Sequence, residues 1–256
     1  MESTDYSYED LRAIAAGVGD RDGWDFSHMK TERDPVPWDY LEVVARYITP
    51  KDAVLDIGTG GGEKLLSLAR HFDTAVGVDP DPDMIRAARA NGEAFPNVSF
   101  AEMGAEELEF PAASFDVALT RHAPVRVPEV VRVLKPGGYF VTQGVGANNM
   151  ANIRQSFGTG SGTRYDEEHR SRIDEFARLG CRIVATGAYD VRYRVKDVPS
   201  LIFWFKAIAG ANEVPEGFSI DRDWRTVQRI IAEHGGPDGV LTNEHRTLLV
   251  IQKPST

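Results

Sequence analysis

Residues 54–63 read Val-Leu-Asp-Ile-Gly-Thr-Gly-Gly-Gly-Glu, and this stretch decides the fold. An apolar run that ends in glycines is typical of a buried strand that turns sharply into a helix. Glycines in such a turn adopt positive φ angles and let backbone N–H groups approach a ligand closely. The stretch therefore predicts a nucleotide or nucleoside site at the carboxyl edge of a parallel sheet.

An acidic residue at the end of the following strand strengthens this prediction. The next apolar segment ends in Gly77-Val78-Asp79, about twenty residues after the glycines, which is the spacing of a ribose-binding acid. A carboxylate there can accept hydrogen bonds from both vicinal hydroxyls of a ribose. The glycine turn and this acid together are much more specific than either feature alone.

From residue 51 onward, short apolar strands alternate with segments long enough to be crossover helices. This alternation predicts an α/β fold with a parallel sheet covered on both faces. We expect strands over residues 53–57, 74–78, 98–101, 115–119, 139–143, 182–195 and 246–252. We expect helices over residues 38–47, 63–71, 82–90, 128–134, 166–179 and 219–234.

The glycine turn itself distinguishes two classes of ligand. The dinucleotide fingerprint Gly-x-Gly-x-x-Gly/Ala needs a small third residue, and Glu63 stands at that position. Asp56 instead precedes Gly58 by two residues, and a buried carboxylate facing the turn suits a cation such as an α-ammonium group. This arrangement resembles motif I of the class I S-adenosylmethionine-dependent methyltransferases.

Further stretches resemble the same family in order and spacing, and together they cover residues 51–145. They are Val76–Arg89, Phe100–Leu108, Phe110–Val117 and Glu129–Gly138. The resemblance implies a seven-stranded, mostly parallel sheet with helices on both faces. It also implies S-adenosyl-L-methionine as the cofactor, with an N-terminal helical lid and a late helical insertion added to the common fold.

The resemblance also assigns residues to parts of the cofactor. The methionine part falls to Asp56, Gly58, Thr59 and Gly60, the ribose to Asp79, and the adenine to Pro80, Met84, Ala105 and Glu106, with Thr120 as a further cofactor-binding residue. One position departs from the family, because many relatives carry Asp where this chain has Gly104. The hydrogen bond to the adenine amino group then passes to Glu106, to a backbone carbonyl or to water.

Methyl transfer from a sulfonium is an in-line displacement that depends on alignment and sometimes on removal of a proton. In this family the strand over residues 115–119 ends facing the transferred methyl group, and here it continues as Thr120-Arg121-His122-Ala123-Pro124. His122 is therefore either a general base or a residue that caps the loop or stacks under the cofactor. Arg121 is expected to hold an anionic group of the substrate.

The segments outside the common fold are expected to form the acceptor pocket. We predict an N-terminal aromatic lid over residues 1–50, a methyltransferase domain over residues 51–256, and a helical substrate-pocket insertion at about residues 197–240. Residues 1–37 and the Gly- and Asn-rich segment 145–163 are expected to be mobile and to close over the acceptor. The aromatic residues expected to be either pocket or core are Trp24, Phe26, Trp38, Tyr40, Phe203, Trp204, Phe205, Phe218 and Trp224.

The amino-acid composition limits which partners and metal sites the chain can have. The chain has 256 residues with 29 Lys+Arg and 39 Asp+Glu, a net charge of −10, so nucleic acid is a poor partner. The single cysteine, Cys181, excludes an internal disulfide and a multi-thiolate zinc site. No metal site, membrane span or secretory signal is evident, and we expect a cytoplasmic location.

Three functions stay open at this point. The first is methyl transfer to a small-molecule acceptor. The second is an RNA or protein methyltransferase, because His122-Ala123-Pro124, Glu129 and the turn 135–138 are faintly similar to ribosomal RNA guanine methyltransferases. Those relatives usually carry a four-cysteine zinc module at the N-terminus, which this chain lacks. The third is a methyltransferase-like protein that binds the cofactor without catalysis. The acceptor atom and the oligomeric state are not predicted.

Overall fold

The computed structural model describes residues 6–19 and 26–255. Among these residues, one mixed sheet has the strand order β1-β7-β9-β6-β5-β2-β3-β4, and β8 pairs with β9. Strands β2 (Ala53–Ile57), β3 (Thr74–Asp79), β4 (Val98–Glu102), β5 (Phe115–Arg121) and β6 (Leu134–Val145) pair in parallel. Strand β9 (Gly239–Gln252) is antiparallel to both β6 and β7 (Arg182–Val195). Within the described ranges, the sheet thus has nine strands rather than the expected seven, because the short strands β1 and β8 join the mostly parallel arrangement of the other seven.

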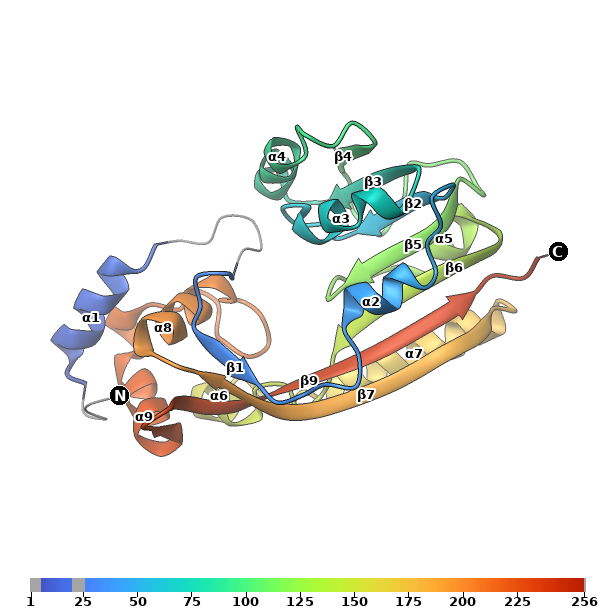
Figure 1. Cartoon of the computed structure of the whole chain (residues 1–256). Helices are drawn as coiled ribbons and strands as arrows, with labels where there is room; N and C mark the ends of the chain where they lie inside the picture. The colour runs from blue at the N-terminus through green and yellow to red at the C-terminus, as the bar shows by residue number, and fades with distance from the viewer. Residues whose placement is uncertain (1–5, 20–25, 256) are drawn as a thin grey trace.

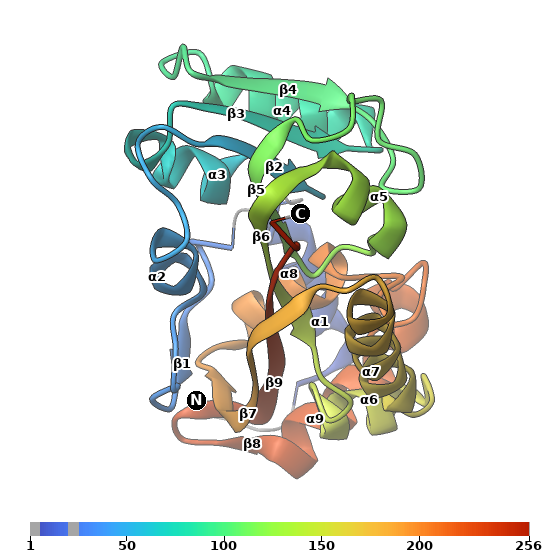
Figure 2. The same cartoon turned by 90° about the vertical axis from the view of Figure 1, so that its right-hand side faces the viewer.

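Helices cover both faces of this sheet (Figure 2). One face carries α2 (Tyr40–Ala45), α3 (Glu63–Ser67) and α4 (Pro82–Asn91), and the other carries α5 (Val127–Val133) and α7 (Thr163–Arg178). Successive residues of a strand face opposite sides, so Val54 packs into the first layer and Leu55 into the second. This two-sided burial explains why β2 is apolar throughout, apart from Asp56.

A second group of helices forms a lobe with a core of its own, which we call the helical lobe. It consists of α1 (Tyr8–Gly17), α6 (Ala151–Phe157), α8 (Val198–Ala207) and α9 (Ile220–His234) (Figure 1). Its core includes Leu11 of α1, Ile153 of α6, Phe205 of α8 and Ile230 of α9, all with 0% exposure. The amphipathic spacing of α9 places its apolar side in this core.

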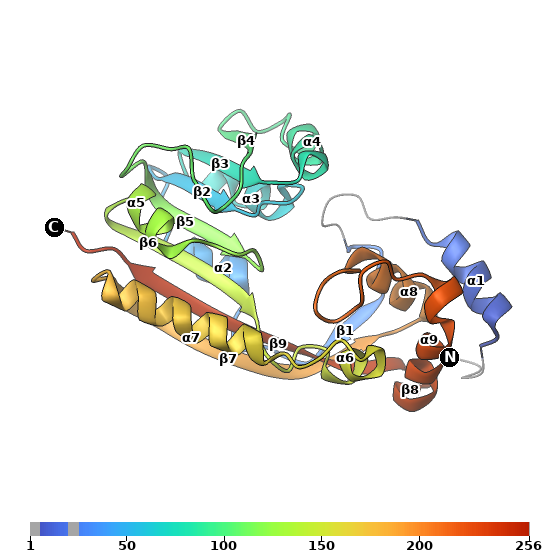
Figure 3. The ribbon, with the colours of Figure 1, turned by 180° about the vertical axis from the view of Figure 1, so that it is seen from behind.

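Strands β7 and β9 run from the sheet into the helical lobe. Leu248 and Val250 of β9 pack in the core of the sheet, whereas Val240 of the same strand packs in the core of the helical lobe. Helix α7 lies along both strands on one side (Figure 3). Because β6 leaves the sheet at Val145 and leads into α6, the carboxyl ends of the parallel strands face the helical lobe.

Several expected elements have different boundaries in the structure. The expected helix 63–71 is α3 followed by a separate 3-10 turn, Ala69–His71. The last strand begins at Gly239 rather than at residue 246. Its first half is polar, and it extends because it pairs with β7 as far as Val195, opposite Val240. Pairing with a long neighbour, rather than an apolar pattern, determines this part of the strand.

The N-terminal 50 residues supply elements to three parts of the structure: the helical lobe, the sheet edge and one face of the sheet. Helix α1 packs on α8 and α9, β1 (Thr31–Arg33) pairs with β7, and α2 packs on the sheet. The segment 1–37, which was expected to be a mobile part of the lid, thus contains an edge strand, while Trp24 lies outside the described residues. Strand β8 is the pair Gly235–Gly236. None of the helices in the described part of the chain combines the length and apolar character that crossing a membrane requires.

Candidate functional site

Residues 58–62, which we call the glycine loop, connect β2 to α3 and are held by β3. The N–H groups of Gly58 and Thr59 donate to the carbonyl oxygen of Val78 at 2.8 and 2.9 Å. The N–H of Gly60 donates to Asp79 Oδ2 at 3.0 Å, and the N–H of Asp81 donates to Asp79 Oδ1 at 3.0 Å. The buried carboxylate of Asp79 therefore joins the two strand ends at the edge where it is expected to meet a ribose.

Asp56 lies beneath the glycine loop with 8% exposure. Its Oδ2 atom accepts a hydrogen bond from the Thr59 hydroxyl at 2.8 Å. Burial, together with the nearby Asp79, raises the pKa of Asp56 to about 6, against the effect of the Thr59 hydrogen bond. Burial without a cationic partner disfavours the ionised form of a carboxylate. An ammonium group of a ligand placed beside Asp56 would therefore stabilise the ionised carboxylate.

The loop after β5 rests directly on the glycine loop. Gly58 has φ +73°, and a Cβ atom at this position would lie 2.2 Å from the Cβ of Ala123. Only glycine combines this backbone conformation with so close an approach. The contact brings residues 121–124 to the loop predicted to hold the cofactor, although they follow it by more than sixty positions in the sequence.

At the expected adenine end, the Glu106 side chain takes the room that a larger residue at position 104 would need. A Cβ on Gly104 would lie 2.4 Å from Glu106 Oε2. The N–H of Met103 donates to the Asp79 carbonyl oxygen at 3.0 Å, which fixes this segment to β3. Ala105 packs at the edge of the sheet core, Met84 is half-buried in α4, and Pro80 is exposed. The carboxylate of Glu106 thus lies directly beside the backbone of Gly104.

His122 has an uncommon backbone conformation for a residue other than glycine, with φ +67°. Its N–H donates to the Gln143 carbonyl oxygen at 2.9 Å, and its Nε2 atom lies 3.4 Å from Gln143 Nε2. Trp38 Nε1 donates to Gln143 Oε1 at 3.2 Å. Because Gln143 Oε1 accepts from Trp38, its amide group is the donor toward His122, which assigns the neutral tautomer with hydrogen on Nδ1.

The side chain of His122 is open to solvent although protein atoms crowd it on most sides. This crowding, and then the charges of Arg121 and Arg246, lower the pKa of His122 well below its ordinary value. The imidazole is therefore neutral at pH 7 and able to accept a proton. A substrate hydroxyl would have to replace Gln143 at Nε2, where the present contact is long.

The two residues before His122 differ in their surroundings. Thr120 has 0% exposure, and its hydroxyl donates to the Ile57 carbonyl oxygen at 2.8 Å, so it joins β5 to β2 beneath the site. The Tyr40 hydroxyl donates to the Thr120 carbonyl oxygen at 3.2 Å. The Arg121 side chain, in contrast, is exposed and has no hydrogen bond or ion pair with any residue that the structure describes.

Comparison with known proteins identifies the type of domain to which these site residues belong. Residues 54–138 match the family model of a methyltransferase domain. The chain contains a class I S-adenosylmethionine-dependent methyltransferase domain. S-adenosyl-L-methionine is the methyl donor that this family implies, and it is consistent with the Asp56, glycine-loop and Asp79 arrangement.

Bacterial proteins are among the relatives that match the methyltransferase domain. The uncharacterized methyltransferase YcgJ of Bacillus subtilis is 39% identical over 34% of this chain and 38% of its own length. Its crystal structure covers 85% of this chain and 99% of that chain with a TM-score of 0.58 and 18% identity.

Two further relatives match in the same region. The uncharacterized methyltransferase sll0829 of Synechocystis is 35% identical over 36% of this chain and 47% of its own length. The demethylmenaquinone methyltransferase of Tropheryma whipplei is 33% identical over 37% of this chain and 42% of its own length. The chain thus spans less than half of each curated relative that it matches here.

Most of the late aromatic residues belong to the core of the helical lobe rather than to the methyltransferase site. The rings of Phe205 and Phe218 are 5.6 Å apart, and both contact Phe157. Phe203 contacts Phe26, with ring centroids 6.2 Å apart. Tyr40 and Trp38 are the predicted aromatics that reach the site, because α2 precedes β2 and packs on the strands that carry Thr120 and Gln143.

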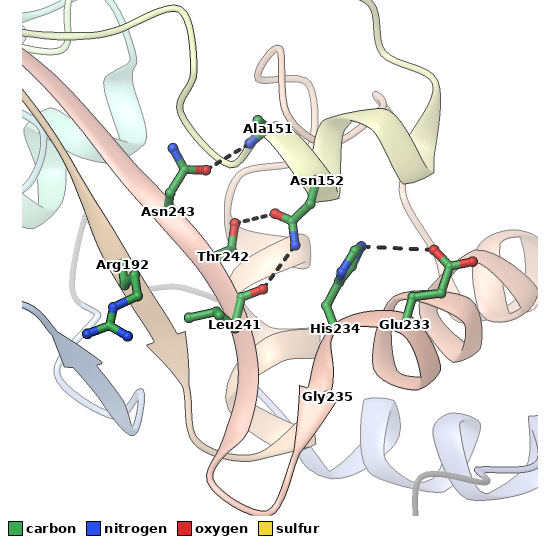
Figure 4. Close-up of a pocket in the computed structure, with 9 residues that line it drawn as sticks. All are labelled: Ala151, Asn152, Arg192, Glu233, His234, Gly235, Leu241, Thr242 and Asn243. Carbon is green, nitrogen blue, oxygen red and sulfur yellow. Dashed lines mark hydrogen bonds and ion pairs between the residues drawn. The ribbon is translucent and has the colours of Figure 1, made fainter.

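A cavity of about 420 Å³ lies elsewhere, between α6, α9 and the start of β9 (Figure 4). No residue of the glycine loop lines it. Its polar groups satisfy one another, since Asn152 donates to the Leu241 carbonyl oxygen at 2.9 Å and accepts from the Thr242 hydroxyl at 2.7 Å. This cavity is separate from the methyltransferase site.

Sequence reasoning missed three residues near the site: Gln143, Glu244 and Arg246. Gln143 carried a signal, because it is a polar residue at the end of an otherwise apolar strand and is only 4% exposed. Glu244 and Arg246 gave none, because the first half of β9 has no apolar alternation that would place them on a face.

Proposed function

We propose that the chain transfers the methyl group of S-adenosylmethionine to a small-molecule acceptor by in-line displacement. The observation that carries this proposal is the contact of Gly58 with Ala123, which brings the donor loop against the loop that bears His122. The membership of residues 54–138 in the methyltransferase family supports the reaction type.

Residues of β2, β3 and the segment after β4 would hold the cofactor. Asp56 would pair with its ammonium group, and the amides of the glycine loop would approach the methionine part. Asp79 would accept from the ribose hydroxyls with the lone pairs left by Gly60 and Asp81, and Glu106 would lie at the adenine edge. When bound, the cofactor supplies a methyl group already activated by the positive sulfur.

The remaining requirements are alignment of the acceptor, exclusion of water and, for a hydroxyl acceptor, removal of a proton. His122 is the group placed to hold that proton, because its imidazole is neutral and lies on the loop in contact with the glycine loop. The helical lobe faces the same edge of the sheet, and we propose that it and the preceding N-terminal segment form the acceptor pocket.

Two observations favour a small acceptor over a nucleic acid. The net charge of −10 opposes binding to a phosphate backbone. The demethylmenaquinone methyltransferase, a relative in the matched region, is named for a small-molecule acceptor.

Calorimetric titration with S-adenosylhomocysteine and with NAD tests the cofactor assignment. We expect S-adenosylhomocysteine to bind and NAD not to bind. Asp79→Ala should weaken binding by about 1.5–3 kcal/mol, the contribution of hydrogen bonds to a charged group. Asp174→Ala, which removes an exposed carboxylate from α7, is the matched control and should leave the affinity unchanged. NAD binding without S-adenosylhomocysteine binding would refute the proposal.

A further inference from the structure

We propose that the acceptor carries an anionic oxygen group, a carboxylate or a phosphate, and that Arg121 and Arg246 bind it. This inference rests on the proposed function, because the two arginines lie where the acceptor must meet the methyl donor. The residues that carry it are on β5 and β9, outside the groups assigned to the cofactor.

The strand register places the two arginines on one face of the sheet. Arg121 of β5 lies opposite Gln143 of β6, and Gln143 lies opposite Leu248 of β9. Arg246 precedes Leu248 by two residues, so it shares this face at the same carboxyl edge. Both charges act on His122, and each also acts on the other: crowding by protein atoms, followed by Arg246, lowers the pKa of Arg121.

The guanidinium group of Arg246 is held by several hydrogen bonds, but one of its N–H donors has no partner in the described part of the chain. Its side chain is 13% exposed, and one guanidinium nitrogen, Nη1, donates to Asn149 Oδ1 and to the His245 carbonyl oxygen. The other, Nη2, lies 3.4 Å from Glu244 Oε2. Its buried Nε atom has no hydrogen-bond partner among the described residues. A buried donor without a partner costs free energy, so the hydrogen bonds around Arg246 leave part of its donor capacity unused. An anionic ligand would use this capacity if the guanidinium group rotates toward it.

The nearby negative charge does not balance the positive charge. Glu244 is shared, because it pairs with Arg33 at 3.0 Å and with Arg246 at 3.4 Å, and it accepts from the Tyr189 hydroxyl at 2.7 Å. Burial and Glu244 raise the pKa of Tyr189, so that phenol is neutral.

Tyr40 and Asp39 also face these arginines, but neither removes the excess of positive charge. Burial, above all, raises the pKa of Tyr40, so this phenol is also neutral. Asp39 acts on Arg33 but already caps α2 by accepting from the N–H of Leu41. Glu244 is therefore ion-paired with two guanidinium groups, those of Arg33 and Arg246, while Arg121 has no ion pair with any described residue, in a chain whose net charge is −10.

Two aromatic rings, those of the half-buried Trp38 and the buried Tyr189, lie next to Arg246, which is opposite Tyr189 in the strand register. The Trp38 ring packs on Gly187, where a Cβ would lie 3.1 Å from Trp38 Cζ3, and its centroid is 4.8 Å from that of Tyr189. A bulkier residue at position 187 would displace the indole from the strand. Guanidinium groups bind carboxylate and phosphate through paired hydrogen bonds, while flat rings favour a flat apolar body. The site therefore suits an aromatic acid or an aromatic phosphate.

The test titrates the full chain, saturated with S-adenosylhomocysteine, with benzoate, phenyl phosphate and benzamide in separate calorimetric experiments. We expect at least one anion to bind about tenfold or more tightly than neutral benzamide, and the comparison of the two anions separates carboxylate from phosphate. Arg121→Gln should weaken binding of that anion by about 10- to 100-fold and leave benzamide unchanged. Arg246→Lys should weaken it too, since it keeps the charge but loses the planar fork.

Arg164→Gln, on the exposed surface of α7, is the matched control and should bind the anion as the wild type does. Equal affinity for all three compounds, no saturable binding of either anion, or undiminished anion binding in both site variants would overturn the inference while leaving cofactor binding intact. If the wild-type chain fails to bind S-adenosylhomocysteine at all, the proposed function itself is refuted.

Discussion

His122 combines strained backbone geometry with a neutral imidazole at the predicted reaction site. Its φ of +67° is found for only two other non-glycine residues in the described ranges, Ala113 and Met150, which have φ +57° and +48°. Such strain persists where the surrounding structure enforces it, and it is common at functional sites. Glycine at position 122 would relieve this strain but would remove the imidazole.

Replacing His122 by Ala and by Gly separates these two effects. If His122 is the general base, both variants should slow methyl transfer by at least about 100-fold. The Gly variant should melt at a temperature equal to or higher than that of the Ala variant, because glycine relieves the positive φ. S-adenosylhomocysteine affinity should change little. Turnover that survives in both variants would make His122 structural, and collapse of cofactor binding would place it in the adenosyl pocket.

Asp56 links pH, stability and cofactor binding. Its pKa is about 6 in the folded chain against an ordinary value of 3.8. Below pH 3.8 the group is protonated in both states and has no effect. Between these two values the unfolded state releases the proton first, so stability falls as pH rises, by about 1–3 kcal/mol above pH 6. Asp56→Asn should remove this loss in denaturant titrations at pH 7.

The same carboxylate should make cofactor binding release a proton. An ammonium group favours ionised Asp56, so S-adenosylhomocysteine affinity should rise as pH increases through about 6. Calorimetry in buffers of different ionisation enthalpy measures that proton directly. In Asp56→Asn the proton release should vanish and the affinity should fall. Identical proton release in the variant would assign the titration to another group.

At the scale of elements, the contact between the glycine loop and the loop after β5 is the most sensitive junction. Gly58→Ala would place its Cβ 2.2 Å from that of Ala123 and would strain a backbone at φ +73°. We expect S-adenosylhomocysteine affinity to fall by at least about tenfold, since the loop must move. Adding Ala123→Gly should restore part of it, because this removes the clash but not the strain. No rescue would mean that the backbone angle alone is responsible.

Sequence reasoning recovered the elements that local patterns determine. Strand β2 has the predicted bounds Ala53–Ile57, because buried parallel strands between turns are apolar and short. The glycine loop and Asp79 were likewise visible, because each requires particular residue types. Glu106 was one of three alternatives named beside Gly104, and its position against the Gly104 backbone could not be predicted, since side-chain direction leaves no mark in sequence spacing. The N-terminal and late helices were predicted, but their packing into one lobe was not, because α1 and α9 meet only through tertiary contacts.

At the scale of the whole molecule, the helical lobe faces the carboxyl edge of the sheet and is the part expected to respond to ligands. The segment 145–163 leads from β6 through α6, whose Ile153 has 0% exposure in the lobe core. Amide hydrogen exchange in this segment should slow when S-adenosylhomocysteine is added, if the lobe closes over the acceptor. The exposed end of α7 provides an internal reference. Equal exchange with and without the ligand would contradict a closing lid.

Strands β7 and β9 contain 14 residues each and pass without interruption from the sheet to the helical lobe. No linker separates the part that would hold the methyl donor from the part that would hold the acceptor. Cutting between them would break a continuous ladder of backbone hydrogen bonds, so the two parts should melt in one cooperative transition. Opening and closing must then occur by twisting of a two-stranded ribbon rather than by rotation about a hinge. Acceptor specificity in this architecture cannot be exchanged by swapping a module, and it would have to change residue by residue along the ribbon.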